Sequence, residues 1–121
     1  IIFDTTYAGG PHDSLKIYTS IVFPLNSFEG EKNITMTIQN NQAILIFEPS
    51  MVFNIPAVLN VTFVGLDLND VNPSTVNFVY INDDGSTKHV NRKDLKVVKG
   101  EGRIELQDAV IPHFSRLAFT R

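Results

Sequence analysis

The run from 111 to 121, IPHFSRLAFTR, sets an imidazole and a hydroxyl close together in an otherwise apolar stretch. Acyl-transfer chemistry uses such a base and nucleophile, so His113 and Ser115 are candidate catalytic residues. The run also fits a β-strand, in which successive side chains face opposite ways. If the Arg116 side chain points to solvent, the solvent-facing side of the strand also carries Phe114 and Ala118. The side that faces the core then carries His113, Ser115, Leu117 and Phe119. We favour this interpretation, in which the imidazole and hydroxyl are half-buried groups that need hydrogen-bond partners.

Oxygen-rich side chains before Pro73 offer a second candidate site, for calcium. The candidate ligands are Asp67, Asn69 and Asp70, together with Asp83 and Asp84 on a neighbouring loop. Val71 occupies the place where a calcium loop needs a further ligand, and Asx residues beside a proline are typical of turns. The three histidines, His12, His89 and His113, lack ligand spacing within one element. We therefore expect neither a metal nor another cofactor.

The composition is that of one globular domain spanning 1–121. Hydrophobic residues make up 43% of the chain, nine of them Phe, and charged residues make up 19%, which excludes a disordered chain or a membrane span. The net charge is −3 and the ten basic residues are scattered, so we expect no nucleic-acid binding. The absence of cysteine excludes disulfides and a thiolate nucleophile. Because the chain starts at Ile1 without a leader, we expect it to be a fragment of a larger protein.

The dominant hydrophobic period is two, which is typical of half-buried strands. Turn signals such as Asn40-Asn41, Asp83-Asp84-Gly85 and Gly100-Glu101-Gly102 separate the apolar runs. The predicted hairpins pair 34–39 with 42–47, 76–82 with 86–90, and 95–98 with 103–107. No window shows a convincing helical stripe, so no helix layer is available to cover a sheet. The sequence therefore predicts an all-β fold, an antiparallel β-sandwich of about eight to ten short strands.

Several motifs in order resemble one family. GGPHDSLKIYTSIVFPLNSF has paired glycines, a strand and an apolar-proline step; ILIFEPSMVFNIPAVLNVTF has a strand, a proline, a phenylalanine and a second proline before an alternating strand. With VYINDDGSTKHV and HFSRLAF, they make most of the chain similar to the ZU-five-like domains of ankyrins, netrin receptors and bacterial cell-envelope proteins. The segment 25–28 departs from the turn that members often carry there. The resemblance implies a sandwich used for protein contacts or as a spacer, in an extracytoplasmic or cell-envelope setting.

The resemblance also gives the C-terminal run a specific chemistry. An identical His-Phe-Ser triplet is the self-cleavage point of some death-domain-associated ZU-five proteins and of an autoproteolytic nucleoporin domain. By that analogy Ser115 Oγ would attack the Phe114 carbonyl, His113 would act as the base or polarise the strained amide, and water would hydrolyse the resulting ester. This step needs a distorted peptide bond.

From these observations we expect a non-catalytic protein-interaction or spacer module of a multidomain surface or envelope protein. Its partners would be other protein domains of the same or another chain. One alternative is a self-cleaving module that acts at the bond between Phe114 and Ser115. Another is a carbohydrate- or calcium-dependent binding module, in which Tyr7, Tyr18 and Tyr80 would stack on sugar rings. The acceptor patterns at Asn33 and Asn60 are interpreted as polar faces of strands.

Overall fold

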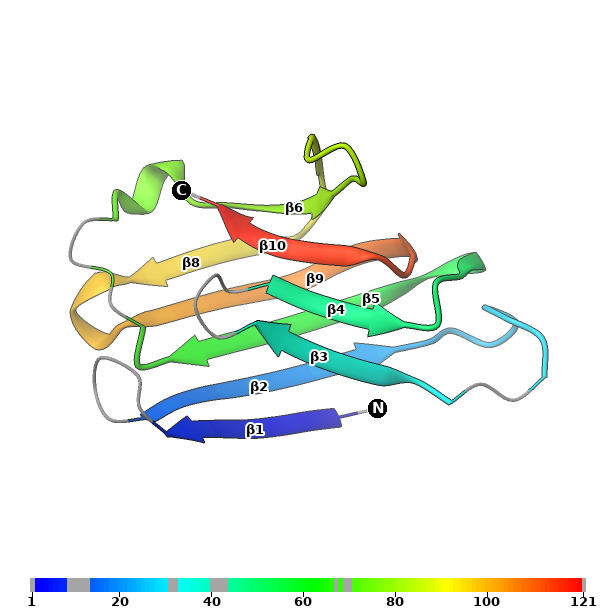
Figure 1. Ribbon diagram of the computed structural model, residues 1–121, viewed down its shortest axis with the longest axis horizontal. Helices are drawn as coiled ribbons and strands as arrows, with labels where there is room; N and C mark the ends of the chain where they lie inside the picture. The colour runs from blue at the N-terminus through cyan, green and yellow to red at the C-terminus, as the bar shows by residue number, and fades with distance from the viewer. Residues whose placement is uncertain are drawn as a thin grey trace.

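A computed structural model describes residues 2–8, 14–30, 33–39, 44–66, 68 and 71–120. The described chain forms two five-stranded antiparallel sheets, which confirms the predicted all-β sandwich. Sheet A has the order β1 (Ile2–Ala8), β2 (Ser14–Val22), β5 (Val52–Val64), β9 (Arg103–His113) and β8 (Asp94–Val98). Sheet B has the order β3 (Thr35–Gln39), β4 (Ile44–Glu48), β10 (Arg116–Thr120), β6 (Asn77–Ile81) and β7 (Thr87–His89). In Figure 1, β3, β4 and β10 lie across β2, β5 and β9 as two layers.

The three predicted hairpins are present. The pairs are β3 with β4, β6 with β7, and β8 with β9, each antiparallel. The turn between β6 and β7 is closed by hydrogen bonds from Asn82 N to Ser86 O at 2.8 Å and from Gly85 N to Asn82 O at 2.9 Å. The predicted turn at Asn40-Asn41 lies outside the described residues.

The turn between β8 and β9 needs a glycine at one position. A short 3-10 helix, η2 (Lys99–Glu101), ends at Gly102, whose φ of 61° is left-handed. The backbone of Leu66 packs so closely there that a Cβ on Gly102 would lie 2.4 Å from the Leu66 carbonyl oxygen. The Gly102 carbonyl also accepts hydrogen bonds from the backbone N–H groups of Gly65 and Leu66. These two hydrogen bonds therefore hold the β8–β9 hairpin against the end of β5. A second 3-10 helix, η1 (Pro73–Thr75), precedes β6.

Long-range pairing places β5 at the centre of sheet A, between β2 and β9. The register of β5 with β9 shifts between Leu59 and Val61, because an extra residue of β9 bulges out opposite Asn60. Asp108, in the bulge, has a φ of 50°, and its backbone N–H donates to Asn60 Oδ1 at 3.0 Å. The Asn60 side chain is thus engaged in the sheet, as its interpretation as a strand-face residue predicts.

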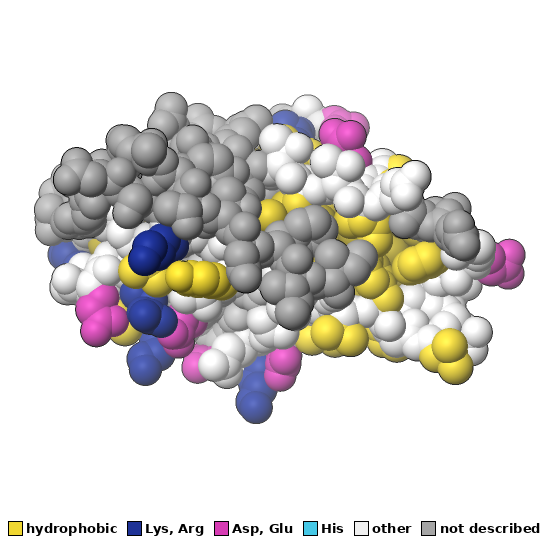
Figure 2. All heavy atoms as spheres, turned by 90° about the horizontal axis from the view of Figure 1, so that it is seen from below, with side chains coloured by type: hydrophobic (Ala, Val, Ile, Leu, Met, Phe, Trp, Pro, Cys, Tyr) yellow, Lys and Arg dark blue, Asp and Glu magenta, His cyan; other side chains and the backbone are white. Residues whose placement is uncertain are grey.

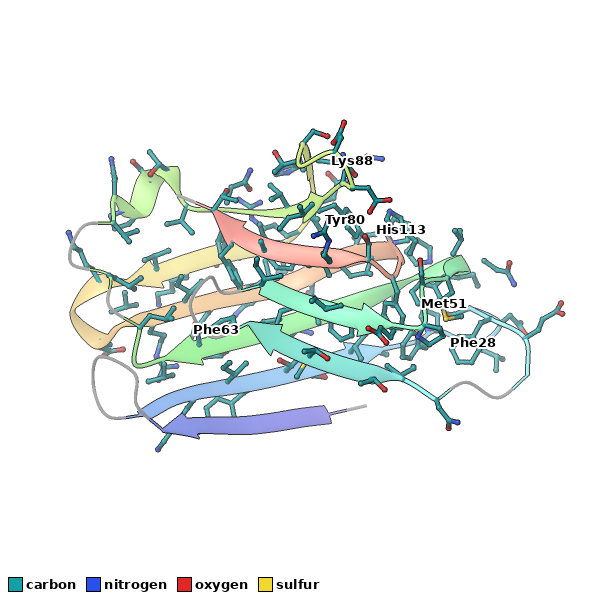
Figure 3. All side chains as sticks on the ribbon, in the orientation of Figure 1. Phe28, Met51, Phe63, Tyr80, Lys88 and His113 are labelled. Carbon is teal, nitrogen blue, oxygen red and sulfur yellow. The ribbon has the colours of Figure 1, made fainter. Side chains whose placement is uncertain are left out.

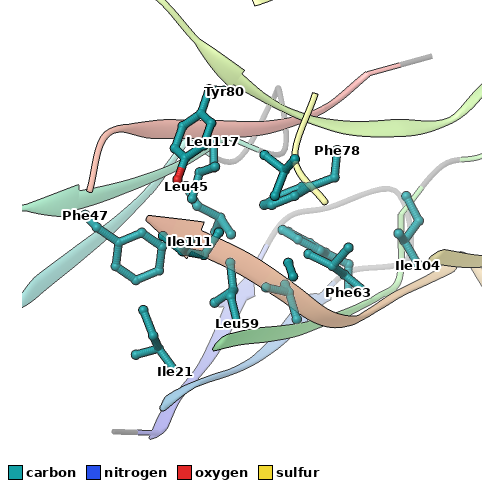
Figure 4. Packing of buried hydrophobic residues seen from close by; sticks show 14 of the residues in the cluster. Ile21, Leu45, Phe47, Leu59, Phe63, Phe78, Tyr80, Ile104, Ile111 and Leu117 are labelled. Carbon is teal, nitrogen blue, oxygen red and sulfur yellow. The ribbon is translucent and has the colours of Figure 1, made fainter. Parts of the chain in front are cut away.

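The core lies between the sheets, where the alternation of side chains buries one face of each strand. In sheet A, Ile21 pairs with Leu59, and both side chains are fully buried. In sheet B, Leu45 pairs with Leu117, which pairs with Tyr80, and all three are buried. Figure 4 shows these residues of the two layers packed against one another. None of the helices in the described part of the chain is long and apolar enough to cross a membrane.

Candidate functional site

The candidate catalytic run forms a corner between the two sheets and not one continuous strand. β9 ends at His113 in sheet A, and β10 begins at Arg116 in sheet B. Phe114 N–H donates to the Met51 carbonyl at 2.8 Å, and the Ser115 carbonyl accepts from Phe47 N–H at 3.4 Å. The backbone of the corner is therefore held by one contact on each side.

The predicted facing of this run is wrong at the corner. Phe114, expected on the solvent face, is buried with 1% of its surface exposed, whereas His113 and Ser115 are partly buried, as the half-buried interpretation expects. Within β10 the prediction holds for Arg116, which is partly exposed, and for Leu117, which is buried, but Ala118, expected on the face of Arg116, is also buried. The reason is that the chain changes sheets at the corner, which breaks the two-residue period of a regular strand.

Phe114 closes one end of the core by contacts with three other aromatic rings. Its ring stacks on Phe47 of sheet B, with centroids 5.0 Å apart and planes at 13°. It meets Phe53 of sheet A edge to face at 4.8 Å and Phe23, which follows β2, at 5.9 Å. Because these rings come from both layers, Phe114 joins the sheets at this end.

His113 stacks on Tyr80, with ring centroids 4.3 Å apart and planes at 15° (Figure 3). The Tyr80 hydroxyl donates to the His113 carbonyl oxygen at 2.9 Å. Burial raises the pKa of Tyr80 to about 12. The phenol therefore keeps its proton at neutral pH and acts as a donor to the backbone, and the partly buried His113 imidazole packs on the Tyr80 ring.

The acyl-shift chemistry needs a strained bond between Phe114 and Ser115. That peptide bond is trans, and neither residue has a positive φ. Arg116, next in sequence, is used to hold the β6–β7 hairpin, since its Nη2 donates to the Asn82 carbonyl at 3.2 Å and lies 4.0 Å from Asp83 Oδ1. The contacts at the corner are those of a packed turn between two sheets.

The structure describes only part of the predicted calcium site. Asp67, Asn69 and Asp70 lie outside the described residues, as does His12. Asp83 and Asp84 are exposed on the β6–β7 turn. Asp84 Oδ1 accepts from Ser86 N at 2.9 Å and from Ser86 Oγ at 2.5 Å, and these bonds lower the pKa of the Asp84 carboxyl. This carboxylate therefore serves to close a turn.

Other described residues near the predicted site also have structural partners. Asn72 caps η1, because its Oδ1 accepts from Ser74 N at 3.1 Å, and Val71 is buried. His89 lies on β7, with Nδ1 3.4 Å from the Asn77 amide nitrogen. Within the described ranges, no three His, Cys, Asp or Glu side chains lie close enough together to hold a metal ion.

The outer face of sheet A carries an apolar row that crosses three strands. Val22 of β2 pairs with Val58 of β5, which pairs with Val110 of β9. Val22 is 53% exposed and Val110 40% exposed, and Val58 is partly buried. Further large hydrophobic residues are exposed at this end of the sandwich, where β2 ends and β5 begins: Leu25, Val52 and Ile55.

The other end of the same face is polar. Lys96 of β8 pairs with Glu105 of β9, which pairs with Thr62 of β5, which pairs with Tyr18 of β2. Arg103 Nη1 lies 2.8 Å from Glu105 Oε1 in an ion pair. Figure 2 looks onto the edge of the sandwich where β1 lies, and it shows charged side chains mainly at the lower left and hydrophobic side chains toward the right.

The apolar row is the feature that sequence reasoning missed. Each of the three valines stands in the polar phase of an alternating strand, next to a buried residue such as Ile21, Leu59 or Ala109. The sequence shows that each valine stands where the alternation of its strand expects a polar residue, but only the strand register shows that the three valines are neighbours.

Comparison with known proteins finds no matching family model, no matching curated protein and no matching solved structure. The ZU-five-like assignment stays a prediction from the motifs in the sequence.

Proposed function

We propose that this chain is a non-catalytic interaction or spacer module of a multidomain protein, and that it contacts a neighbouring protein domain through the outer face of sheet A. The observation that carries the proposal is the row of Val22, Val58 and Val110, together with the exposed Leu25 and Val52 at the same end. Contiguous exposed apolar surface on a soluble domain marks a site of contact.

The arrangement of polarity along the face suits a protein partner. Interfaces between proteins place apolar residues at their centre and polar residues at the rim. Here the apolar row gives way, along the strands, to Thr62, Glu105 and Lys96. A domain seated on the valines would therefore meet hydrogen-bonding and charged groups at one side. The resemblance to ZU-five-like domains supports the same role and a place in a surface or envelope protein.

A photo-crosslinking amino acid tests this proposal in the full-length parent protein within its own cells. We expect crosslinks to one protein domain from positions 22 and 110, because both lie in the apolar row. Lys96 is the matched control, since it is exposed on the outer face of the same sheet but at the polar end. Absence of crosslinks at all three positions, or equal crosslinking from position 96, would contradict the proposal.

Intact-mass spectrometry separates this function from self-cleavage. We expect a single full-length mass after prolonged incubation of the purified chain. Loss of the segment that begins at Ser115, together with its retention in Ser115→Ala, would establish the self-cleaving module instead. The carbohydrate- or calcium-dependent alternative is tested by glycan binding with and without a chelator. We expect no signal in either state, because Tyr18 and Tyr80 do not form one stacking surface for a sugar. The Tyr80 ring is buried in sheet B, whereas Tyr18 is 47% exposed on sheet A.

A further inference from the structure

Strand β3 is an edge strand of sheet B in the described part of the chain, and its own residues include neither a charge nor a proline to block pairing. In the described part of the chain, no strand pairs with its outer side. Edge strands are commonly blunted by charge, proline, shortness or a bulge. β8 carries Asp94 and Lys96, and β7 has only three residues. β3, Thr-Met-Thr-Ile-Gln, has no charge and no proline, and it pairs with β4 without a register shift.

The hydrogen bonding of β4 shows which backbone groups of β3 face outward. Phe47 N–H donates to the Ser115 carbonyl, so Phe47 faces β10. Because successive residues of a strand direct their backbone groups to opposite sides, Ile46 faces β3. Its partner Thr37 therefore directs its N–H and C=O toward β4. It follows that Met36 and Ile38 present theirs to the free edge.

The side chains of β3 that the structure describes, at positions 35 to 37, divide in the same way. Met36 is opposite Phe47, which is buried, and Met36 itself is partly buried against the core. Thr35 and Thr37 are exposed on the outer face. A strand added along this edge would therefore meet the backbone donors and acceptors of Met36 and Ile38. It would need apolar residues opposite those two and a neutral residue opposite Thr37.

We propose that a second copy of this chain occupies this edge, with the two β3 strands antiparallel about a two-fold axis at Thr37. Met36 of each copy is then opposite Ile38 of the other, and each such pair exchanges two backbone hydrogen bonds, about four in all. The contact is isologous, which means that both copies use the same surface. β3 itself supplies the apolar residues opposite Met36 and Ile38 and the neutral residue opposite Thr37. Since β3 is uncharged, no like charges face each other across the axis. The proposal concerns the edge of sheet B and is independent of the function proposed for the face of sheet A.

Cysteine crosslinking tests this register, because the chain has no cysteine of its own. The two Thr37 residues form a non-hydrogen-bonded pair with Cα atoms about 4.5 Å apart, within the range of about 4.4–6.8 Å that a disulfide spans. The matched control is Thr35, exposed on the same face, whose two copies would lie about 13 Å apart along the strands. We expect oxidised Thr37→Cys to form a covalent dimer, and Thr35→Cys to stay monomeric under the same conditions.

Sedimentation velocity over a range of concentrations gives the second readout. The unmodified chain is expected to dimerise reversibly. Thr37→Lys, which sets two charges opposite each other, should weaken dimerisation by at least roughly ten-fold, while Thr35→Lys should leave it nearly unchanged. Circular dichroism and thermal unfolding of both lysine variants check that the fold is retained.

Several outcomes would overturn the proposal. The unmodified chain could stay monomeric at every concentration, or Thr35→Cys could crosslink as well as Thr37→Cys. A dimer that survives Thr37→Lys would use another surface. A monomer that binds an added peptide of alternating apolar and polar residues would assign the edge to a different protein's strand.

Discussion

Replacing Phe114 by alanine tests the finding that this residue joins the two sheets. The ring is 1% exposed and contacts Phe47, Phe53 and Phe23. Phe→Ala changes in cores cost about 3–5 kcal/mol, through lost transfer free energy and the cavity left behind. The high end is expected here, because each of the three neighbouring rings loses a partner. A domain of 121 residues has a total stability of about 6–18 kcal/mol. The variant should therefore lose a quarter or more of it.

Urea unfolding monitored by circular dichroism measures this loss. With a slope of about 1–3 kcal/mol per molar urea, a loss of about 5 kcal/mol should lower the midpoint by roughly 1.7–5 M at unchanged slope. Val52→Ala is the control, since Val52 is 78% exposed at the same end of the sandwich, and its midpoint should change little. A loss below about 1 kcal/mol for Phe114→Ala, or equal losses for both variants, would refute the placement of Phe114. It would favour the regular strand in which this side chain points to solvent.

Three further predictions concern single contacts. Tyr80→Phe should cost about 0.5–1.5 kcal/mol, through loss of the hydrogen bond to the backbone. Because the folded pKa of Tyr80 is about 12 and the unfolded value is about 10, its contribution is complete below pH 10 and is lost as the pH rises toward 12. Denaturant titrations should thus show a steeper fall in stability above pH 10 for the unmodified chain than for Tyr80→Phe. Gly102→Ala should destabilise the fold by at least about 2 kcal/mol in thermal or urea unfolding, from backbone clash and positive φ, whereas Gly100→Ala, with open space around its Cβ position, should be nearly neutral. Asn60→Ala should cost about 1 kcal/mol in the same assay, because the backbone N–H of Asp108 in the bulge loses its acceptor, and no measurable change would contradict a stabilising role for this hydrogen bond.

Local pattern in the sequence was sufficient for the three hairpins. A turn such as Asp83-Asp84-Gly85 between two alternating runs specifies a neighbour only a few residues away, and β6 and β7 pair as predicted. The caps and turn closures at Asn72 and Asp84 follow for the same reason, since their hydrogen bonds reach only two residues along the chain.

The candidate site could not be predicted to the same extent. The sequence put His113 and Ser115 on the inner face because it treated the run as one strand. Where a chain leaves one sheet for the other depends on the spacing between the layers and on rings such as Phe47 and Phe53, which lie far away in sequence. No local period carries that information.

The sequence by itself determined the all-β class, the phase of most strands and the three hairpins, because alternation and turn chemistry act over a few residues. Only the tertiary structure decided that Phe114 is buried, that Val22, Val58 and Val110 are neighbours, and that β3 is an edge. These facts depend on register and strand order between distant segments. Distant pairing is selected by packing the whole core and not by any one stretch of residues.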